Sequence, residues 1–206
     1  MWTVFFVKKW LAMILILGVS LYMFSVFQDR NTLNEEILRL HVVANSDSEE
    51  DQAVKLKVRD AVIGELEQVM NGLSDKEEAE QIVKEKLQDL QKAANAVLDA
   101  EGFSDRAIVT LTAEEFPTRF YDTFTLPAGI YDSLRITIGE GEGHNWWCVV
   151  FPSLCVPAVV EGVEDMAVGA GFSDSLTGAI TGQQGYEVRF FFLDCLGRLE
   201  NFFHFG

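Results

Sequence analysis

The sequence has few cysteines and few basic residues, and each shortage excludes a class of protein. Its three cysteines cannot all pair within one molecule, so a dense disulfide scaffold is excluded and at most one intramolecular bridge fits. Lys and Arg number 16 against 32 Asp and Glu, and the formal charge of −16 repels phosphate backbones and provides no basic surface for DNA or RNA. A chain of 206 residues can bury one ordinary core, so we expect one folded domain behind a leader.

The leader is the uncharged run at residues 10–27, which follows Lys8 and Lys9. Its length is near the lower limit for crossing a bilayer, and the two lysines place its N-terminal side in the cytoplasm. Everything after it then lies outside. Gly18-Val-Ser20 is the one small-x-small candidate for a cleavage site, so removal and retention both stay open. We assign residues 1–28 to a signal peptide or membrane anchor.

Residues 37–43 alternate as in a half-buried strand, with Leu38, Leu40 and Val42 on one side and Arg39 and His41 on the other. The next seven residues, Asn45-Ser-Asp-Ser-Glu-Glu-Asp51, predict a helix start, with Ser48 as the N-cap and carboxylates at the positive end of the helix dipole. Their alternating oxygens resemble a calcium loop, but the glycine and the distant glutamate of an EF-hand are missing. Capping therefore explains this segment better than a metal site, and we predict no metal and no cofactor.

Two apolar stripes at helical spacing follow between Glu49 and Ala100. The first helix ends near Gly72, and Ser74-Asp-Lys-Glu77 predicts a capping box that opens the second. Because the connection is short, the two helices are expected to pack antiparallel.

From Arg106 onward the apolar period changes to two, which is typical of strands. Residues 123–126 predict an edge strand, and residues 131–151 a hairpin with a long, flexible, glycine-rich tip. Residues 161–184 read as a loop, and alternation returns as a strand over residues 186–193.

These elements predict an α+β fold: a mixed, mainly antiparallel sheet of about five or six short strands, with the two-helix hairpin packed on one face. Residues 29–160 form the α+β domain. Residues 161–206, a Gly-rich loop and a C-terminal strand, belong to the same domain.

The segment Gly139-Glu-Gly-Glu-Gly-His-Asn-Trp-Trp-Cys148 holds the candidate binding residues. Tryptophan supplies a large contact area with few rotatable bonds, which makes it frequent among binding hot spots. Consecutive strand residues point to opposite faces, so we expect Trp147 to pack inward with Val149 and Phe151, and Trp146 to face the helices or a partner. The candidate partner-binding residues are Gly141, Gly143, Asn145, Trp146 and Trp147. A nucleotide loop is excluded, because a strand rather than a helix follows the glycines and two glutamates would repel an anion.

Cys148 allows a different chemistry, because His144 lies nearby in the sequence. A cysteine beside a histidine can act as a thiolate nucleophile, as in cell-wall-cleaving cysteine hydrolases, and His41 and His204 are further candidate bases. Against this, cysteine nucleophiles commonly lie at helix N-termini, whereas Cys148 is in a predicted strand.

Cys148 and Cys155 are also candidates for a disulfide. In one straight strand they would lie over about 20 Å apart, so the chain must turn at Pro152 for the sulfurs to meet. A bridge, buried free thiols and a zinc site all stay open, although zinc lacks a four-ligand spacing.

Several motifs together resemble the stage II sporulation protein R family over roughly residues 36–155. They are Arg39-Leu-His-Val-Val-Ala-Asn-Ser-Asp-Ser48, Asp51-Gln52, Lys55, Val58-Arg-Asp60, Phe116-Pro-Thr118, Leu126-Pro-Ala-Gly129 and the segment from Gly139 to Cys155.

The resemblance implies a signal rather than an enzyme. Proteins of that family are exported from the forespore into the space between the two membranes of a sporulating cell. There they are needed for a membrane-embedded aspartic protease of the mother cell to process a sigma-factor precursor. By this resemblance the protease is the expected partner, and Asp47, Asp51 and Arg59 are conceivable contacts that are equally well explained as helix caps or as a solvated helix face.

Overall fold

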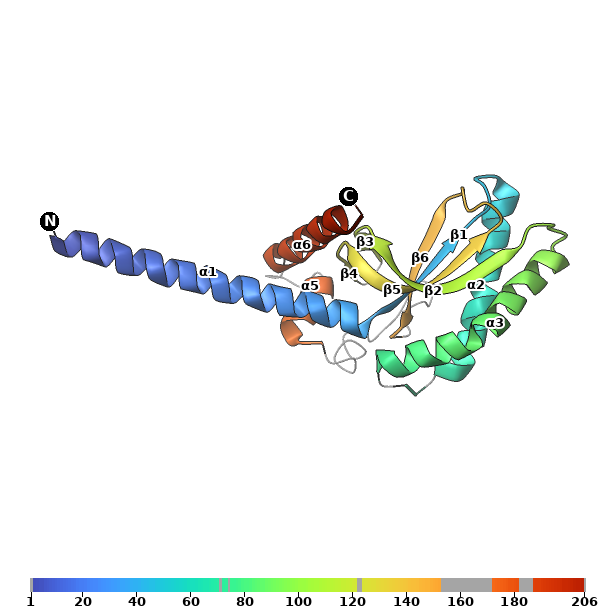
Figure 1. The fold of residues 1–206 in the computed structure, drawn as a ribbon, viewed down its shortest axis with the longest axis horizontal. Helices are drawn as coiled ribbons and strands as arrows, with labels where there is room; N and C mark the ends of the chain where they lie inside the picture. Colours follow the sequence, from blue (N-terminus) through green and yellow to red (C-terminus); the bar gives the residue numbers. More distant parts are fainter. Residues whose placement is uncertain are drawn as a thin grey trace.

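A four-stranded mixed sheet lies at the centre of the computed structural model, with helices on both faces (Figure 1). The structure describes residues 2–70, 72–73, 75–121, 124–152, 172–181 and 187–205. The elements in chain order are α1 (Trp2–Glu36), β1 (Leu38–Val43), α2 (Glu49–Met70), α3 (Lys76–Ala100), β2 (Ala107–Phe116), β3 (Arg119–Phe120), β4 (Thr125–Leu126), β5 (Gly129–Ile138), β6 (Asn145–Phe151), α5 (Asp174–Thr181) and α6 (Glu187–Phe205).

The strand order β2-β5-β1-β6 confirms the predicted α+β class and its mixed, mainly antiparallel sheet. β1 runs parallel to β5 and antiparallel to β6, and β2 runs antiparallel to β5. The predicted hairpin over residues 131–151 is wrong, because β1 lies between β5 and β6. Periodicity identifies strands but does not say which strand lies next to which. The short strands β3 and β4 pair separately from the main sheet.

β1 is buried on both faces, so the prediction of a half-buried strand is wrong even though its alternation is right. Leu38, Leu40 and Val42 belong to the hydrophobic cluster beneath the helices α2 and α3. Arg39 and His41 point to the other face and are only 0% and 4% exposed. The polar side of this strand is therefore covered by protein rather than by water.

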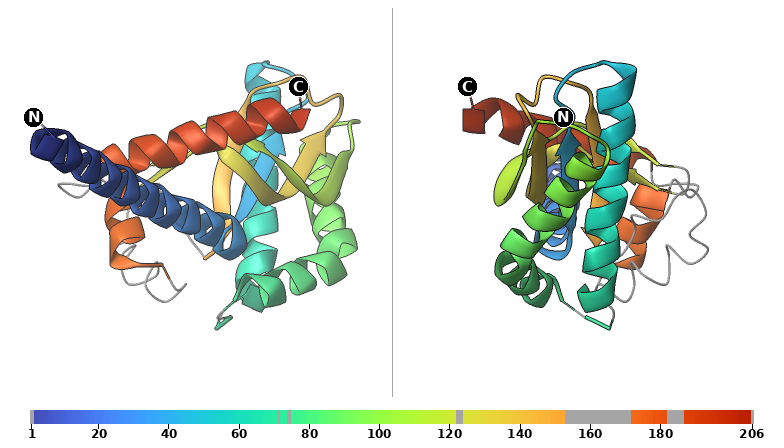
Figure 2. Two further views of the ribbon diagram at one scale, coloured as in Figure 1. Left: turned by 60° about the vertical axis from the view of Figure 1, so that its left-hand side comes forward. Right: turned by 90° about the vertical axis from the view of Figure 1, so that its right-hand side faces the viewer.

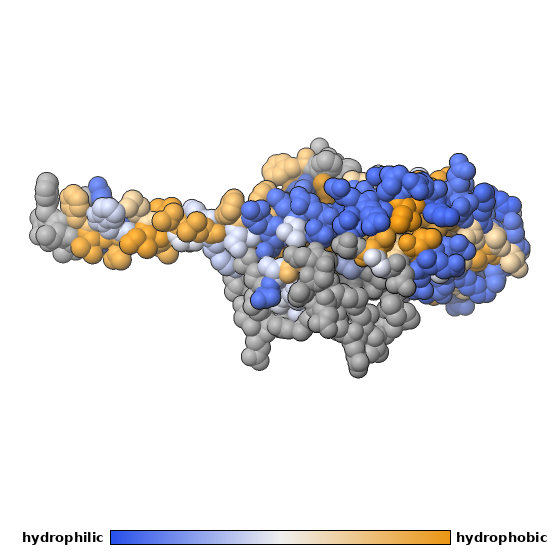
Figure 3. All heavy atoms as spheres, turned by 90° about the horizontal axis from the view of Figure 1, so that it is seen from below, coloured by the Kyte–Doolittle hydropathy of each residue, from blue (hydrophilic) through white to orange (hydrophobic). Residues whose placement is uncertain are grey.

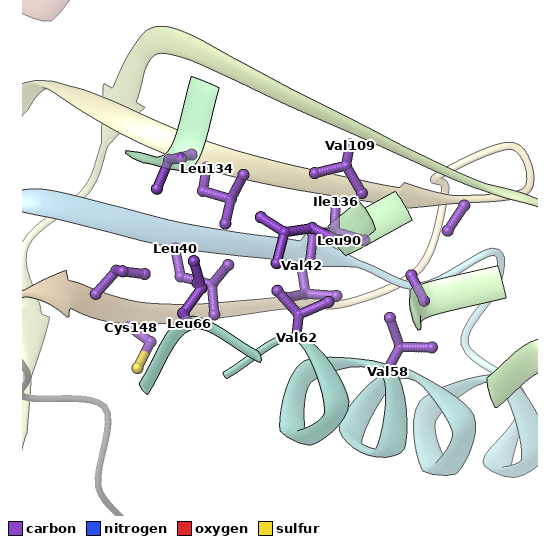
Figure 4. Close-up of a cluster of buried hydrophobic side chains, with 14 of the residues drawn as sticks. Leu40, Val42, Val58, Val62, Leu66, Leu90, Val109, Leu134, Ile136 and Cys148 are labelled. Atoms are coloured by element: carbon purple, nitrogen blue, oxygen red, sulfur yellow. The ribbon is translucent and has the colours of Figure 1, made fainter. Parts of the chain in front are cut away.

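The helices α2 and α3 cover one face of the sheet, as predicted, and Figure 4 shows Val58 and Val62 of α2 beneath Leu40, Val42 and Ile136 of the strands. The predicted cap of α2 is confirmed, since the Ser48 hydroxyl accepts a hydrogen bond of 3.1 Å from the Asp51 amide. For α3 the cap is Asp75, whose carboxylate accepts from the Glu78 amide at 2.8 Å. The predicted cap Ser74 lies outside the described residues.

The opposite face of the sheet is covered by the end of α1 together with α5 and α6 (Figure 2). The predicted C-terminal strand over residues 186–193 is wrong, because Glu187–Phe205 is one helix. A short apolar run fits either period, and the helical spacing shows only farther on, where Leu193, Leu196 and Glu200 turn toward the protein body. The predicted loop over residues 161–184 contains the helix α5, and residues 153–171 and 182–186 lie outside the described residues.

α1 is a single helix that continues beyond the uncharged run into the folded body. Over Phe6–Glu36 it is long and apolar enough to cross a membrane by length and composition. Figure 3 shows its apolar N-terminal part projecting from a largely hydrophilic body. Val26, Leu33 and Ile37 are nevertheless fully or almost fully buried in the second hydrophobic cluster, so the C-terminal end of α1 packs on the folded body.

Candidate recognition site

Two loops that lie far apart in the sequence meet at one end of the sheet. Residues 139–144 cross the end of β1 and hydrogen-bond to the segment that follows it: the Gly143 amide donates to the Ala44 carbonyl at 3.0 Å, and the Glu142 amide to the Asn45 carbonyl at 3.1 Å. The Asn45 side-chain oxygen accepts from the Glu140 amide at 3.0 Å. We call residues 44–48 and 139–144 the loop pair. The two loops hold each other in place, so the predicted flexible tip is instead a connection between strands that is fixed by hydrogen bonds.

The glycines of the loop pair are explained by backbone geometry. Gly139 and Gly141 have φ of +56° and +67°, which side chains with a Cβ rarely adopt. Gly143 is buried, and a Cβ placed on it would lie 2.2 Å from the Ser46 carbonyl oxygen. Gly141 and Gly143, proposed from the sequence as partner contacts, thus have a structural role in closing the loop.

Polar side chains tie the loop pair to the first turns of α2. The Asp51 carboxylate accepts hydrogen bonds from the Ser46 hydroxyl at 2.5 Å and the Asn45 amide at 3.2 Å. The buried Lys55 ammonium donates to the His144 carbonyl at 2.9 Å. Asp51 is therefore occupied as a structural acceptor, and the described part of the chain contains no group of three or more candidate metal ligands.

The two tryptophans point to opposite faces of β6, as strand geometry requires. Trp147 stacks on His41 with ring centroids 3.8 Å apart and meets Phe116 edge-on at 4.7 Å. Trp146 lies on the helix side, 36% exposed, with the Arg59 guanidinium 4.2 Å from its ring centroid. Trp146 is thus the tryptophan that remains accessible beside the loop pair.

Val149 shares the face of Trp147, as predicted, whereas Phe151 does not. The pairing of β6 with β1 shifts between Leu38 and Arg39, where an irregularity inserts one extra residue. Such a bulge reverses the alternation beyond it, which places Phe151 in the cluster beneath the helices. A bulge of this kind leaves no mark in the apolar pattern.

His41 connects three elements on the face opposite the helix pair. Its Nδ1 lies 2.9 Å from the Glu114 carboxylate on β2, and its Nε2 lies 2.8 Å from the Asn145 side-chain oxygen on β6. Glu114 also accepts from Arg135 at 2.9 Å. Asn145, a predicted partner contact, therefore serves as an acceptor for His41. Sequence reasoning missed Glu114, because its partner His41 lies 73 positions away in the sequence.

Burial tends to raise the pKa of Glu114, but its hydrogen bond with His41 and the charges of His41 and Arg135 outweigh this, so its pKa lies below the ordinary value of 4.5. A lowered folded-state pKa stabilises the fold above pH 4.5, and this contribution is lost as the pH falls through the lowered value.

We expect Glu114→Gln to reduce the free energy of unfolding by about 2 kcal/mol at pH 7. The difference from wild type, measured by urea unfolding, is expected to shrink below pH 4.5; a difference independent of pH would contradict this assignment.

Arg39 is fully buried next to this cluster, and no sequence signal distinguishes it from a solvated strand residue. Its guanidinium lies 3.9 Å from the Phe116 ring centroid and 4.9 Å from that of Tyr131, and it donates to the Tyr121 hydroxyl at 2.9 Å. Burial lowers the pKa of Arg39 and raises the pKa of Tyr131 to about 12. The aromatic faces compensate in part for the lost hydration of the cation.

The sulfur chemistry of the site is limited by the position of Cys148. It is buried with Leu40 and Leu66 on the helix side (Figure 4), it is disulfide-bonded, and it points away from the face that carries His41. Cys155 lies outside the described residues, so the pairing of Cys148 with Cys155 stays a prediction. Cys195 is free and exposed.

His144 makes its side-chain contact with an aspartate of the loop pair rather than with this sulfur. His144 is largely exposed, and its Nδ1 contacts the Asp47 carboxylate at 2.5 Å. The side chain of His204 lies outside the described residues. Of the histidines whose side chains the structure describes, His41 lies on the opposite face and His144 pairs with Asp47, so neither provides a base beside Cys148.

Comparison with known proteins gives one family model and one curated relative that carry the same description. A family model described as stage II sporulation protein R matches residues 34–161, which include both halves of the loop pair and Trp146. A protein of Bacillus subtilis (strain 168) named stage II sporulation protein R is 38% identical over 121 residues, which make up 59% of this chain and 54% of that relative. The match thus spans about half the length of the Bacillus protein. No solved structure matches.

Proposed function

Since this chain belongs to the stage II sporulation protein R family, we propose that it is an exported sporulation signal that activates a membrane-embedded aspartic protease by binding it. The protease would process a sigma-factor precursor in the mother cell. The chain would act in the space between forespore and mother cell, either released or anchored by α1, which has the length and composition of a membrane span.

The observation that supports binding is that two of the family-like motifs, which lie far apart in the sequence, meet on one hydrogen-bonded surface. Residues 44–48, 139–144 and the start of α2 are joined by hydrogen bonds, and Trp146 lies at their edge with Arg59 over its ring. A large aromatic side chain held by a cation and a fixed loop loses little entropy when a partner covers it. Asp47, 56% exposed, and Arg59 are charged groups of this surface that a partner could contact.

The rival function, an extracytoplasmic cysteine hydrolase, needs a thiolate beside a general base. Cys148 is disulfide-bonded and lies on the opposite face of β6 from the ring of His41. This arrangement favours the binding role. Release of soluble fragments from purified cell wall by the isolated chain, blocked by a thiol-alkylating reagent, would support the hydrolase instead.

We expect Trp146→Ala to weaken binding to the protease about 30-fold, because hot-spot tryptophans contribute about 2 kcal/mol or more. The full chain, the protease and the precursor would be reconstituted in vesicles. Precursor cleavage would then be followed as the concentration of the chain is varied. The variant is expected to need a correspondingly higher concentration and to keep its circular dichroism spectrum.

The matched control is Phe120→Ala, since Phe120 is an aromatic residue of 79% exposure on β3, away from the loop pair. It is expected to leave cleavage unchanged. Equal losses of precursor cleavage in both variants would show that the loop pair is not the binding surface. Precursor cleavage that does not depend on the chain would contradict the proposed function itself.

A further inference from the structure

The C-terminal helix α6 has its polar and apolar faces reversed relative to an ordinary surface helix. Phe191, Leu199, Phe202 and Phe203 are 64%, 48%, 70% and 78% exposed. A helix that packs on a soluble domain normally turns such residues inward. A group of exposed large apolar side chains marks a surface that contacts something other than water.

Two acidic side chains of α6, Asp194 and Glu200, hold the helix on the protein. Asp194 accepts hydrogen bonds from the Ala128 amide at 3.0 Å and from the Thr118 hydroxyl, and Glu200 pairs with Arg30 of α1. The backbone at Gly197 is so close to β5 that an added Cβ would lie 1.5 Å from the Ala128 carbonyl oxygen. The orientation of α6 is thus fixed with Asp194 and Glu200 inward and with Phe191, Phe202 and Phe203 outward.

The outward residues form one stripe. At about 100° per residue, Phe191, Phe202 and Cys195 fall within about 40° of one another around the helix, and Leu199 and Phe203 extend this arc to about 120°. Arg198, which pairs with Asp194 at 2.7 Å, is the exposed charge beside them. The helix therefore presents a continuous apolar face, here called the α6 stripe, with Cys195 near its middle.

The position of α6 beside α1 indicates what covers this stripe. Tyr22 and Phe192 meet edge-on with ring centroids 5.9 Å apart, and the two helices run side by side in both Figure 1 and Figure 2. Tyr22 lies five residues before Phe27, the end of the uncharged run of α1, which is roughly 7 Å along the helix axis. Interfacial helices bury their apolar faces about 5–10 Å deep at the boundary of headgroups and acyl chains.

We propose that α6 is a second membrane contact: its stripe rests in the outer surface of the bilayer that α1 crosses. The occupant is lipid because α6 contacts α1 at Tyr22, near the end of a run of large apolar side chains between Phe6 and Phe27, most of which are more than half exposed. Charge supplies little of the attraction, since the chain is strongly acidic. Burial of the phenylalanines drives the contact, which makes it insensitive to salt. α6 lies beyond residues 34–161, so the family match does not assign it.

The test uses the free thiol of Cys195 as a reporter in the full chain, reconstituted in neutral phosphatidylcholine vesicles. An environment-sensitive fluorophore on Cys195 is expected to show blue-shifted emission, quenching by lipids brominated near the headgroup, and protection from aqueous iodide. The control carries the fluorophore on Ala53→Cys in a Cys195→Ser background. Ala53 is exposed on α2, so this probe is expected to stay accessible to iodide.

A Phe191→Ser/Phe202→Ser double variant is expected to lose the lipid quenching at Cys195, whereas Phe120→Ser keeps it. Quenching of the Cys195 probe by iodide as strong as that of the Ala53 probe would overturn the proposal. Protection from iodide without lipid quenching, together with cross-linked dimers through Cys195, would assign the stripe to a second copy of the chain and would also overturn it. The readout needs no protease, so it is independent of the proposed function.

Discussion

Replacing Gly143 with alanine is expected to lower the free energy of unfolding by about 3 kcal/mol, near the upper end for overpacking a close-packed site. The added Cβ would lie 2.2 Å from the Ser46 carbonyl oxygen and 2.9 Å from the Ala44 side chain. Relief requires the loop pair to separate, which breaks the hydrogen bond from the Gly143 amide to the Ala44 carbonyl. Urea unfolding followed by circular dichroism measures the loss.

The matched control is Gly64→Ala on α2, where an added Cβ meets nothing within 4 Å. Because alanine is the better helix former, this variant is expected to gain about 0.5–1 kcal/mol. If Gly143→Ala lowers the free energy of unfolding and Gly64→Ala raises it, the requirement for glycine is specific to the loop pair. A neutral Gly143→Ala would contradict the close approach of the two loops.

Trp147→Ala is expected to cost about 3–5 kcal/mol, the range for removing a large aromatic side chain from a core. The variant loses the stack on His41, the edge contact with Phe116 and the cover of the Arg119 guanidinium, which lies 5.0 Å from the ring centroid. Since His41 bridges Glu114 and Asn145, loss of the ring also loosens that polar chain. Thermal and urea unfolding would measure the effect.

Trp147→Phe keeps part of the aromatic contact and is expected to lose clearly less stability than Trp147→Ala. Trp146→Ala is the second comparison, because Trp146 is 36% exposed and its loss leaves no cavity in the core. Its expected effect on unfolding is below about 1 kcal/mol, while its effect on binding is large. Equal destabilisation by both alanine variants would contradict the division of the two tryptophans between core and surface.

Much of this fold was predictable from local patterns. The helical spacing of Val54, Val58 and Val62 identified α2 and its buried face, and the cap at Ser48 followed from residue chemistry. The opposite orientation of Trp146 and Trp147 followed from strand geometry alone. These features depend on neighbours in sequence, so the sequence displays them.

The features that escaped prediction depend on tertiary contacts. Nothing in the apolar alternation of β1 shows that α1, α5 and α6 cover its second face, so the burial of Arg39 and His41 was not foreseen. The pairing of His41 with Glu114 joins residues 73 positions apart. In α6, the apolar run from Phe190 to Leu193 fits the two-residue period of a strand as well as the period of a helix. The close contact of Gly197 with Ala128, which the sequence does not show, belongs to the helical form.

The central place of β1 has a consequence for how the chain matures. This strand is the first of the sheet to be synthesised, yet both of its neighbours come late: β5 begins at Gly129 and β6 ends at Phe151. Pairing over such separations must first overcome a large loop-closure entropy, so the sheet assembles slowly and only after most of the domain exists. For the export proposed above, a body that closes its sheet late would still be unfolded during that interval and could pass through a translocation channel behind α1. Late closure of the sheet would therefore keep the chain competent for export.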